Sequence, residues 1–244
     1  MKELTFIDPR FESTVRDQLD IYDRPIFGSD VLKVGFLDCS NFTFRETADL
    51  PTLMLFRNLH TLHLEIAADD FSFLRAFPKL TELSICCVNQ TFFDVRSLTH
   101  LDSLHDLFLC ADPGYSIELR HLDALPTLKN LRDLSLHDVG SIDLAPLREM
   151  PWLEYFSCCY AAEVKNIDAI GHLTDLKSLS LIDLAVDDLS FLDPLSDKME
   201  LTACGLEIKN GFERQRLTRF LEHDISEITV NGNEVLYEDR HYLI

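Results

Sequence analysis

Glycine and proline are scarce in the 244-residue sequence, with 8 and 9 copies, which excludes collagen-like and low-complexity chains. Long apolar runs are also missing. No stretch approaches the roughly 18 residues of a membrane span, and the N-terminus holds no run of signal-peptide length. Positive charge is in short supply, because 22 basic residues stand against 42 acidic ones and the formal net charge is −20. Such a chain repels phosphate, so we expect no nucleic acid and no membrane surface as partner, and the charge favours a basic protein.

The seven cysteines do not form a spaced disulfide framework. Two adjacent pairs occur, Cys86-Cys87 and Cys158-Cys159, and neighbouring residues on a strand point to opposite faces of a sheet. We therefore expect reduced thiols in a reducing compartment, with the cytoplasm as the location.

Apolar residues make up 46% of the chain, and many of them follow the pattern Leu-x-x-Leu-x-Leu. The copies begin at Leu59, Leu80, Leu104, Leu131, Leu153 and Leu176, with a degenerate seventh copy at Ser196. The spacing matches the leucine-rich repeat period of about 20–29 residues. Each unit can bury its apolar side only against its neighbours. The pattern therefore predicts an α/β leucine-rich repeat solenoid, with a curved parallel β-sheet on the concave face and short helices and turns on the convex face.

The second half of each unit also repeats, as an Asp-like residue before a short apolar stretch. The copies begin at Asp70, Asp94, Glu118, Asp143, Asn166 and Asp188. A carboxylate or amide at this position can accept the unpaired backbone N–H groups of a helical turn. We therefore expect a capped turn at each of these six positions.

Both ends of a solenoid need caps, because a free end would expose the core. Phe11, Val15 and Leu19 fall on one face of a predicted N-terminal helix, and residues 31–37 are expected to form the first strand. Residues 211–223 suggest a closing helix, and Asn231-Gly232 predicts the turn of a final hairpin. We expect one domain over residues 1–244: the N-terminal cap and first strand (1–58), about seven repeats (59–206) and the C-terminal helix and hairpin cap (207–244).

The chain resembles the bacterial, internalin-like leucine-rich repeat proteins over residues 6–206. Phe6-Ile7-Asp8-Pro9 opens the predicted cap helix, and Leu37-Asp38-Cys39-Ser40 matches the Leu-Asp-x-Ser strand end of that family. The resemblance implies a binding scaffold without catalysis. One departure concerns the Asn that the family places three residues after the last Leu of a strand. That column contains Ala67, Val88, Asp112, Val139, Ala161, Leu184 and Cys204 here.

Strand parity places the residues that flank the last two Leu positions of each copy on the concave face. In the seventh copy this assigns Glu200 to the central position and Thr202 to the next. Aromatic side chains among charges are typical of protein recognition. The partner-binding residues that we expect on or beside this face are His63, Glu65, Phe108, Asp133, His137, Asp138, Tyr155, Tyr160 and Asp183.

One concave column contains the ligand types of a structural zinc site: Cys86, Cys110, His137 and Cys159. Four successive strands span about 14 Å, whereas a tetrahedral site needs every ligand atom within about 2.3 Å of the metal. We therefore predict no metal and no cofactor. A nucleophilic pair of Cys110 or Cys159 with His137 lacks a Gly-rich turn to supply an oxyanion hole, so we predict no catalytic residue.

The leading hypothesis is a monomeric, non-catalytic module that binds a protein through its concave face and neutralises or regulates a basic partner. Two alternatives stay open. One is a secreted or host-directed effector, and the other, less favoured, is a Cys/His hydrolase.

Overall fold

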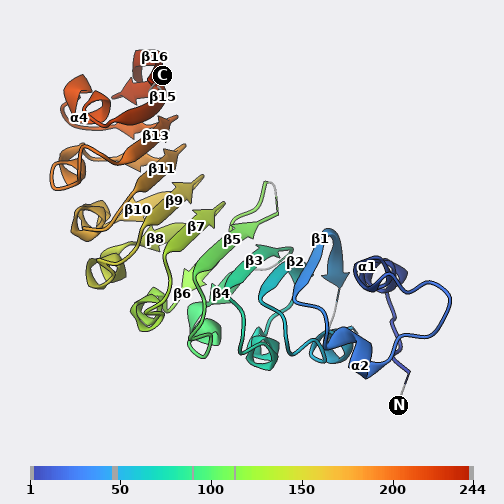
Figure 1. The fold of residues 1–244 in the computed structure, drawn as a ribbon. Coiled ribbons are helices and arrows are strands. Elements are labelled where there is room, and N and C mark those ends of the chain that lie inside the picture. The colour runs from blue at the N-terminus through green and yellow to red at the C-terminus, as the bar shows by residue number, and fades with distance from the viewer. Residues whose placement is uncertain (1–2, 46–48, 90, 113, 242–244) are drawn as a thin grey trace.

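The computed structural model describes residues 3–45, 49–89, 91–112 and 114–241. Its main feature is a curved 12-stranded sheet, and Figure 1 shows the long strands on the inner side of an arc with the short helices on the outer side. The strands of the inner, concave side run parallel to one another. They are β1 (Phe36–Arg45), β2 (Thr61–Ala67), β3 (Glu82–Cys87), β5 (Asp106–Ala111), β7 (Asp133–His137), β9 (Tyr155–Cys159), β11 (Ser178–Ile182), β13 (Glu200–Cys204) and β15 (Glu222–Val230). This is the predicted leucine-rich repeat solenoid.

The alternation of burial along these strands confirms the predicted parity. In β7, Leu134 and Leu136 are buried while their neighbours Asp133, Ser135 and His137 are partly exposed. The buried residues of successive repeats belong to one connected cluster. The repeated leucines therefore build the core, and the residues between them form the concave surface.

A second row of short strands follows the concave strands and leads to the outer helices. These strands are β4 (Phe92–Asp94), β6 (Glu118–Arg120), β8 (Ser141–Asp143), β10 (Glu163–Lys165), β12 (Ala185–Val186) and β14 (Glu207–Ile208). The helices are 3-10 turns: η1 (Ser72–Ala76), η2 (Val95–Leu98), η3 (Leu122–Thr127), η4 (Ala145–Glu149), η5 (Ile167–His172) and η6 (Ser190–Leu192). No helix in the described ranges combines the length and hydropathy needed to cross a bilayer.

Four of the six predicted caps are confirmed. Asp70, Asp94, Asp143 and Asp188 each accept the backbone N–H of the residue two positions on, at 2.7–3.0 Å. The predictions for Glu118 and Asn166 were wrong. Glu118 lies in β6, where its backbone pairs with β4. Asn166 has a left-handed backbone with φ of 55° and caps no N–H with its side chain.

The N-terminal cap contains α1 (Pro9–Leu19), α2 (Gly28–Val31) and α3 (Leu50–Leu53). Helix α1 is the predicted amphipathic helix, with Phe11 and Val15 fully buried. The prediction of a first strand over residues 31–37 was wrong, because β1 begins at Phe36. The Asp30 carboxylate accepts the Phe27 N–H at 2.9 Å and holds the chain in the turn of α2 instead.

The C-terminal cap contains the predicted hairpin, formed by β15 and the antiparallel β16 (Asn233–His241). Asn231 and Gly232 have φ of 49° and 74°, as the tight hairpin turn requires. The predicted closing helix is shorter than expected: α4 covers only Arg214–Thr218. The chain leaves the helix early because β15 begins at Glu222 and pairs with β13.

The register of the seventh repeat corrects the sequence reading by two residues. Leu179 pairs with Leu201, and Leu181 pairs with Ala203. Thr202 therefore takes the central concave position that the sequence pattern assigns to Glu200. The prediction failed because Lys198 occupies the place of the first Leu and Ala203 that of the third. A shift of two residues keeps the side-chain parity.

Candidate functional site

The strand register aligns the middle residues of successive strands in a central column on the concave face. This column consists of His63, Ser84, Phe108, Ser135, Ser157, Ser180, Thr202 and Asp224. Most of these side chains are small. Phe108 is therefore the one large apolar side chain among these eight residues, third from the N-terminal end of the column.

His63 and Glu65 lie on β2, toward the N-terminal end of the face, and both have neighbours within the protein. The ring of His63 packs edge-on against Phe36 with centroids 5.7 Å apart, and its Nε2 lies 3.0 Å from an oxygen of Glu82. Glu65 accepts a hydrogen bond from the hydroxyl of Thr43. Three strand spacings of about 4.8 Å separate β2 from β7, so these two residues form a group apart from the centre.

Phe108 and His137 form the centre of the face. Their rings meet edge to face with centroids 4.8 Å apart, and His137 Nε2 lies 3.2 Å from the Ser157 hydroxyl. Burial lowers the pKa of His137 below its ordinary value, so the ring is neutral at pH 7. The centre therefore offers an apolar ring and an uncharged imidazole.

Three carboxylates line one side of this centre in register. Glu82, Asp106 and Asp133 pair across β3, β5 and β7, at a strand spacing of about 4.8 Å. Burial, followed by the charge of Glu82, raises the pKa of Asp106. Burial, followed by the charge of Asp106, raises the pKa of Asp133. The three carboxylates therefore concentrate negative charge on this side of the centre, although neighbouring members of the row repel one another. The expected set includes Asp133 but omits Asp106 and Glu82, although their shared column was visible in the sequence.

Two tyrosines extend the surface. Tyr155 is in register with Asp133 and is 41% exposed, and Tyr160 is 51% exposed. Tyr160 lies where β9 ends, and Asp138 and Asp183 occupy the equivalent positions after β7 and β11. Of the residues expected from the sequence, the structure thus brings Asp133, Phe108, His137 and Tyr155 together on β5, β7 and β9. Asp138, Tyr160 and Asp183 lie at the adjoining strand ends.

These strand ends share a left-handed backbone. Asp138, Tyr160, Asp183 and Gly205 have φ of 53°, 57°, 51° and 65°. Each donates its N–H to a carbonyl of the next repeat, at 2.8–3.1 Å. The residue that follows each of them is buried: Val139, Ala161, Leu184 and Leu206. Backbone hydrogen bonds and apolar packing therefore replace the Asn of the internalin-like pattern.

The column of Cys86, Cys110, His137 and Cys159 does not gather at one point. In the residues that the structure describes, no three His, Cys, Asp or Glu side chains come together as metal ligands. Burial raises the pKa of the Cys110 and Cys159 thiols. Each thiol is therefore protonated beside a neutral His137, and a nucleophilic thiolate is disfavoured.

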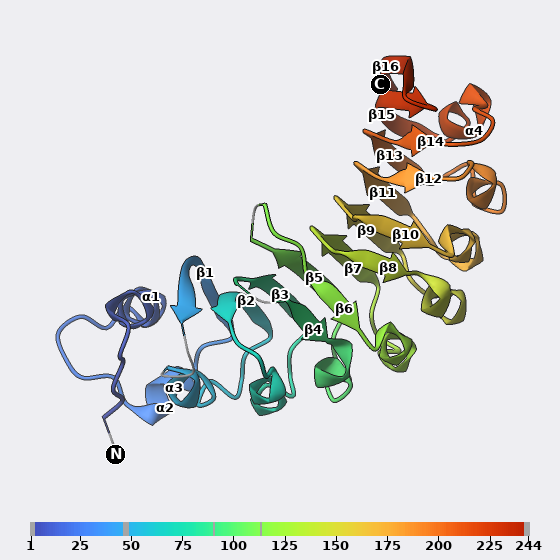
Figure 2. The ribbon, with the colours of Figure 1, turned by 180° about the vertical axis from the view of Figure 1, so that it is seen from behind.

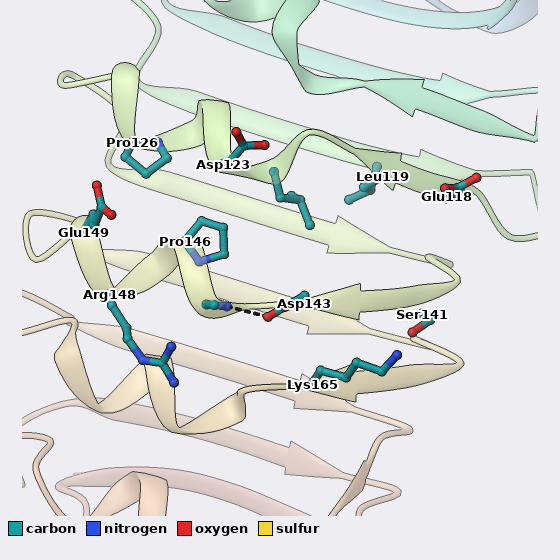
Figure 3. Close-up of a pocket in the computed structure, with 12 residues that line it drawn as sticks. Glu118, Leu119, Asp123, Pro126, Ser141, Asp143, Pro146, Arg148, Glu149 and Lys165 are labelled. Carbon is teal, nitrogen blue, oxygen red and sulfur yellow. Dashed lines mark hydrogen bonds between the residues drawn. The ribbon is translucent and has the colours of Figure 1, made fainter.

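The outer surface also has a hollow of about 750 Å³ between η3 and η4, which sequence reasoning did not identify (Figure 3). Its lining combines Leu119 and two prolines with charges of both signs, including Glu118 and Lys165. Arg148 on its rim is already paired with Asp168 at 2.7 Å. This mixed lining selects no particular ligand charge.

Neither a protein-family model nor a curated protein matches the sequence. Solved structures do match. Internalin C2 from Listeria monocytogenes superposes with a TM-score of 0.66 and 18% identity, over 93% of this chain and 94% of that one. Internalin InlF from the same species gives a TM-score of 0.54 and 17% identity, over 93% and 83%. The TLR13–ssRNA13 complex gives 0.58 and 17%, over 85% of this chain but only 30% of the other. The chain therefore has the internalin-like leucine-rich repeat fold that the sequence resemblance implies.

Proposed function

We propose that this chain is a non-catalytic protein-binding module whose concave face receives a basic, partly apolar segment of a partner protein. The observation that carries the proposal is the registered row of Glu82, Asp106 and Asp133 beside Phe108. A solenoid presents its concave face as an extended surface for binding. One solved structure with this fold, TLR13, is a complex with an RNA, which supports a role in molecular recognition for the fold.

The row of carboxylates supports a binding role because it lowers the stability of the folded state. Like charges opposite one another on neighbouring strands destabilise a sheet. Burial first, and the neighbouring carboxylate second, raise the pKa of Asp106 and of Asp133, so the ionised forms of both groups are disfavoured in the folded state. Surfaces kept at the expense of stability are typical of functional sites. Lysine or arginine side chains of a partner would relieve the repulsion, whereas a phosphate backbone would increase it. A protein is therefore proposed rather than a nucleic acid.

The aromatic groups supply the apolar part of the proposed contact. Phe108 is a partly buried residue of the concave face. Tyr155 lies on the same face and Tyr160 at the end of β9, and both tyrosines are about half exposed. Aromatic side chains bury a large area while losing few rotamers. We propose these three as anchors, with Asp138 and Asp183 as charged neighbours and with His63 and Glu65 at the N-terminal margin of the contact.

The proposal includes a monomer in the cytoplasm. All seven cysteines are free thiols, and Cys39, Cys87 and Cys158 are buried. This state fits the reducing compartment expected from the sequence.

The test begins with capture of a stoichiometric partner from the lysate of the source organism, followed by purification of that partner and measurement of Kd. The double variant D106N/D133N should weaken binding by about tenfold or more and reduce its salt dependence. The control E207Q/E234Q removes the same charge from exposed positions on β14 and β16 and should leave Kd nearly unchanged. Equal effects of the two double variants, together with full binding by Phe108→Ala, would overturn the proposal.

A further inference from the structure

A second surface lies on the outer side of the molecule, where the N-terminal cap meets the first repeat, away from the concave face. Met54 and Leu55 follow α3 directly and are 39% and 36% exposed. With Pro51 and Pro78 they line a hollow of about 630 Å³ between α3 and η1. Figure 2 shows α3 on the outer edge of the arc, on the opposite side from the strands. We call this surface the α3 groove; its lining is completed by Arg57, Arg75 and Ala76.

The internal repeats show that the fold does not require apolar residues here. Met54 and Leu55 stand five and four positions before Leu59, the first Leu of their copy. The same two positions in the later copies hold Arg75-Ala76, Thr99-His100, Pro126-Thr127, Arg148-Glu149 and Gly171-His172. None of these pairs carries two large apolar side chains. The last segment of the N-terminal cap therefore departs from the pattern of the repeats at exposed positions.

The rim of the groove carries positive charge in a chain of net charge −20. Among the described residues, neither Arg57 nor Arg75 has a carboxylate within the 4.0 Å of an ion pair. Arg148 occupies the position of Arg75 in a later repeat and is paired with Asp168 at 2.7 Å. Within the part of the chain that the structure describes, two guanidinium groups thus lie beside the exposed Met54 and Leu55 without a carboxylate partner.

We propose that the α3 groove docks a short acidic segment of a partner protein, whose Leu, Met or Phe side chains fill the hollow and whose Asp or Glu side chains pair with Arg57 and Arg75. Charge complementarity selects this occupant, because guanidinium groups bind carboxylates through paired N–H donors. The net charge of −20 repels an acidic segment from most of the molecule, so such a segment would be directed to the two arginines of this groove. The inference concerns a different face from the proposed basic contact and does not depend on it.

The test uses a phage-displayed library of random peptides of about twelve residues, selected on the immobilised full chain. The selected peptides are then measured against the M54T/L55H variant, which plays no part in the selection. This variant copies Thr99-His100 from the equivalent positions of a later repeat, so it should unfold at the wild-type temperature. We expect the selected peptides to combine Asp or Glu with Leu, Met or Phe. Their synthetic forms should lose about tenfold or more in affinity toward M54T/L55H and toward R57E/R75E.

A concave-face control separates this inference from the proposed function. D106N/D133N should bind the selected peptides as the wild type does, whatever it does to the basic partner. Selection of basic peptides, or equal affinity for M54T/L55H, would overturn the proposal. So would a finding that Met54 and Leu55 instead mediate binding to phosphatidylserine vesicles or self-association in analytical ultracentrifugation.

Discussion

The carboxylate of Asp183 fills the space that a Cβ atom on Gly205 would need. Such an atom would overlap Asp183 Oδ1 and would lie 3.3 Å from the Cα of Asp183, and Gly205 also has a φ of 65°. Both residues belong to the left-handed strand ends that join successive repeats. Position 205 therefore requires glycine for two reasons: the Asp183 side chain leaves no room for a Cβ atom, and the backbone is left-handed.

Replacing Gly205 by Ala should destabilise the protein by about 1–3 kcal/mol, because the left-handed backbone is strained for Ala and the Asp183 side chain must move. Urea unfolding measures the change. Gly211→Ala is a matched control with a φ of 55° and no heavy atom within 4 Å of the new Cβ. It should cost only the backbone strain of Ala, about 1–2 kcal/mol. A larger loss for Gly211→Ala than for Gly205→Ala would contradict the role of Asp183.

Asp133→Asn should stabilise the protein at pH 7. The pKa of Asp133 is raised above its ordinary value of 3.8 in the folded state, so the ionised form weakens the fold. This destabilisation is absent below pH 3.8, grows as the pH rises through the folded pKa and is complete above it. The melting temperature of Asp133→Asn should therefore exceed that of the wild type at pH 7 and match it below pH 3.8. Glu207→Gln, at an exposed position, should show no such pattern. A less stable Asp133→Asn at pH 7 would contradict a destabilising effect of the ionised Asp133 carboxylate.

Asp30 should show the opposite dependence on pH. Its carboxylate accepts hydrogen bonds from Arg24 and from the Phe27 N–H, each at 2.9 Å, and the guanidinium lowers its pKa to about 2. The stabilisation is present above the ordinary value of 3.8 and is lost as the pH falls toward 2. Asp30→Asn should cost about 1–3 kcal/mol at pH 7, and its difference from the wild type should shrink in acid. Unfolding curves at several pH values test this, and a constant difference would contradict it.

Leu134→Ala should leave a cavity in the middle of the solenoid, because Leu134 is fully buried between neighbouring repeats. The expected loss is about 2–5 kcal/mol, measured by urea unfolding. Ser135→Ala changes the next side chain, which faces the concave surface, and should alter stability by about 0.5 kcal/mol or less. Similar losses for the two variants would show that burial does not alternate along β7 as described.

The regular part of the fold could be predicted from the sequence because the leucines mark both the repeat and the parity. The same alternation places Phe108, His137 and Asp133 on one face of the sheet. The register of the seventh repeat could not be predicted, since Lys198 and Ala203 stand where large apolar residues were needed to mark it. The start of β1 could not be predicted for a similar reason. Val31 and Val34 are buried in the turn that precedes β1, and the sequence alone does not distinguish valines buried in a turn from valines buried in a strand.

The tertiary features that the sequence did not reveal depend on neighbouring repeats. The left-handed positions include Asp, Tyr and Gly, so no single residue type identifies them. The second-row strands contain two or three residues, which is too short for a periodic pattern. The α3 groove was overlooked because Met54 and Leu55 resemble core residues until their exposure is known. The division into one domain and the binding roles of the concave residues stay predictions.

The ladder between β5 and β7 has a mechanical consequence. It contains four residue pairs, against six between β3 and β5. Beside it, between β6 and β8, the second row is reduced to one isolated bridge between Ile117 and Val139. Since each repeat contacts only its neighbours, a load applied to the two ends passes through every ladder in series. The ladder with the fewest bonds then yields first. A stretched molecule should therefore open between Phe108 and Ser135, dividing the arc into an N-terminal and a C-terminal half.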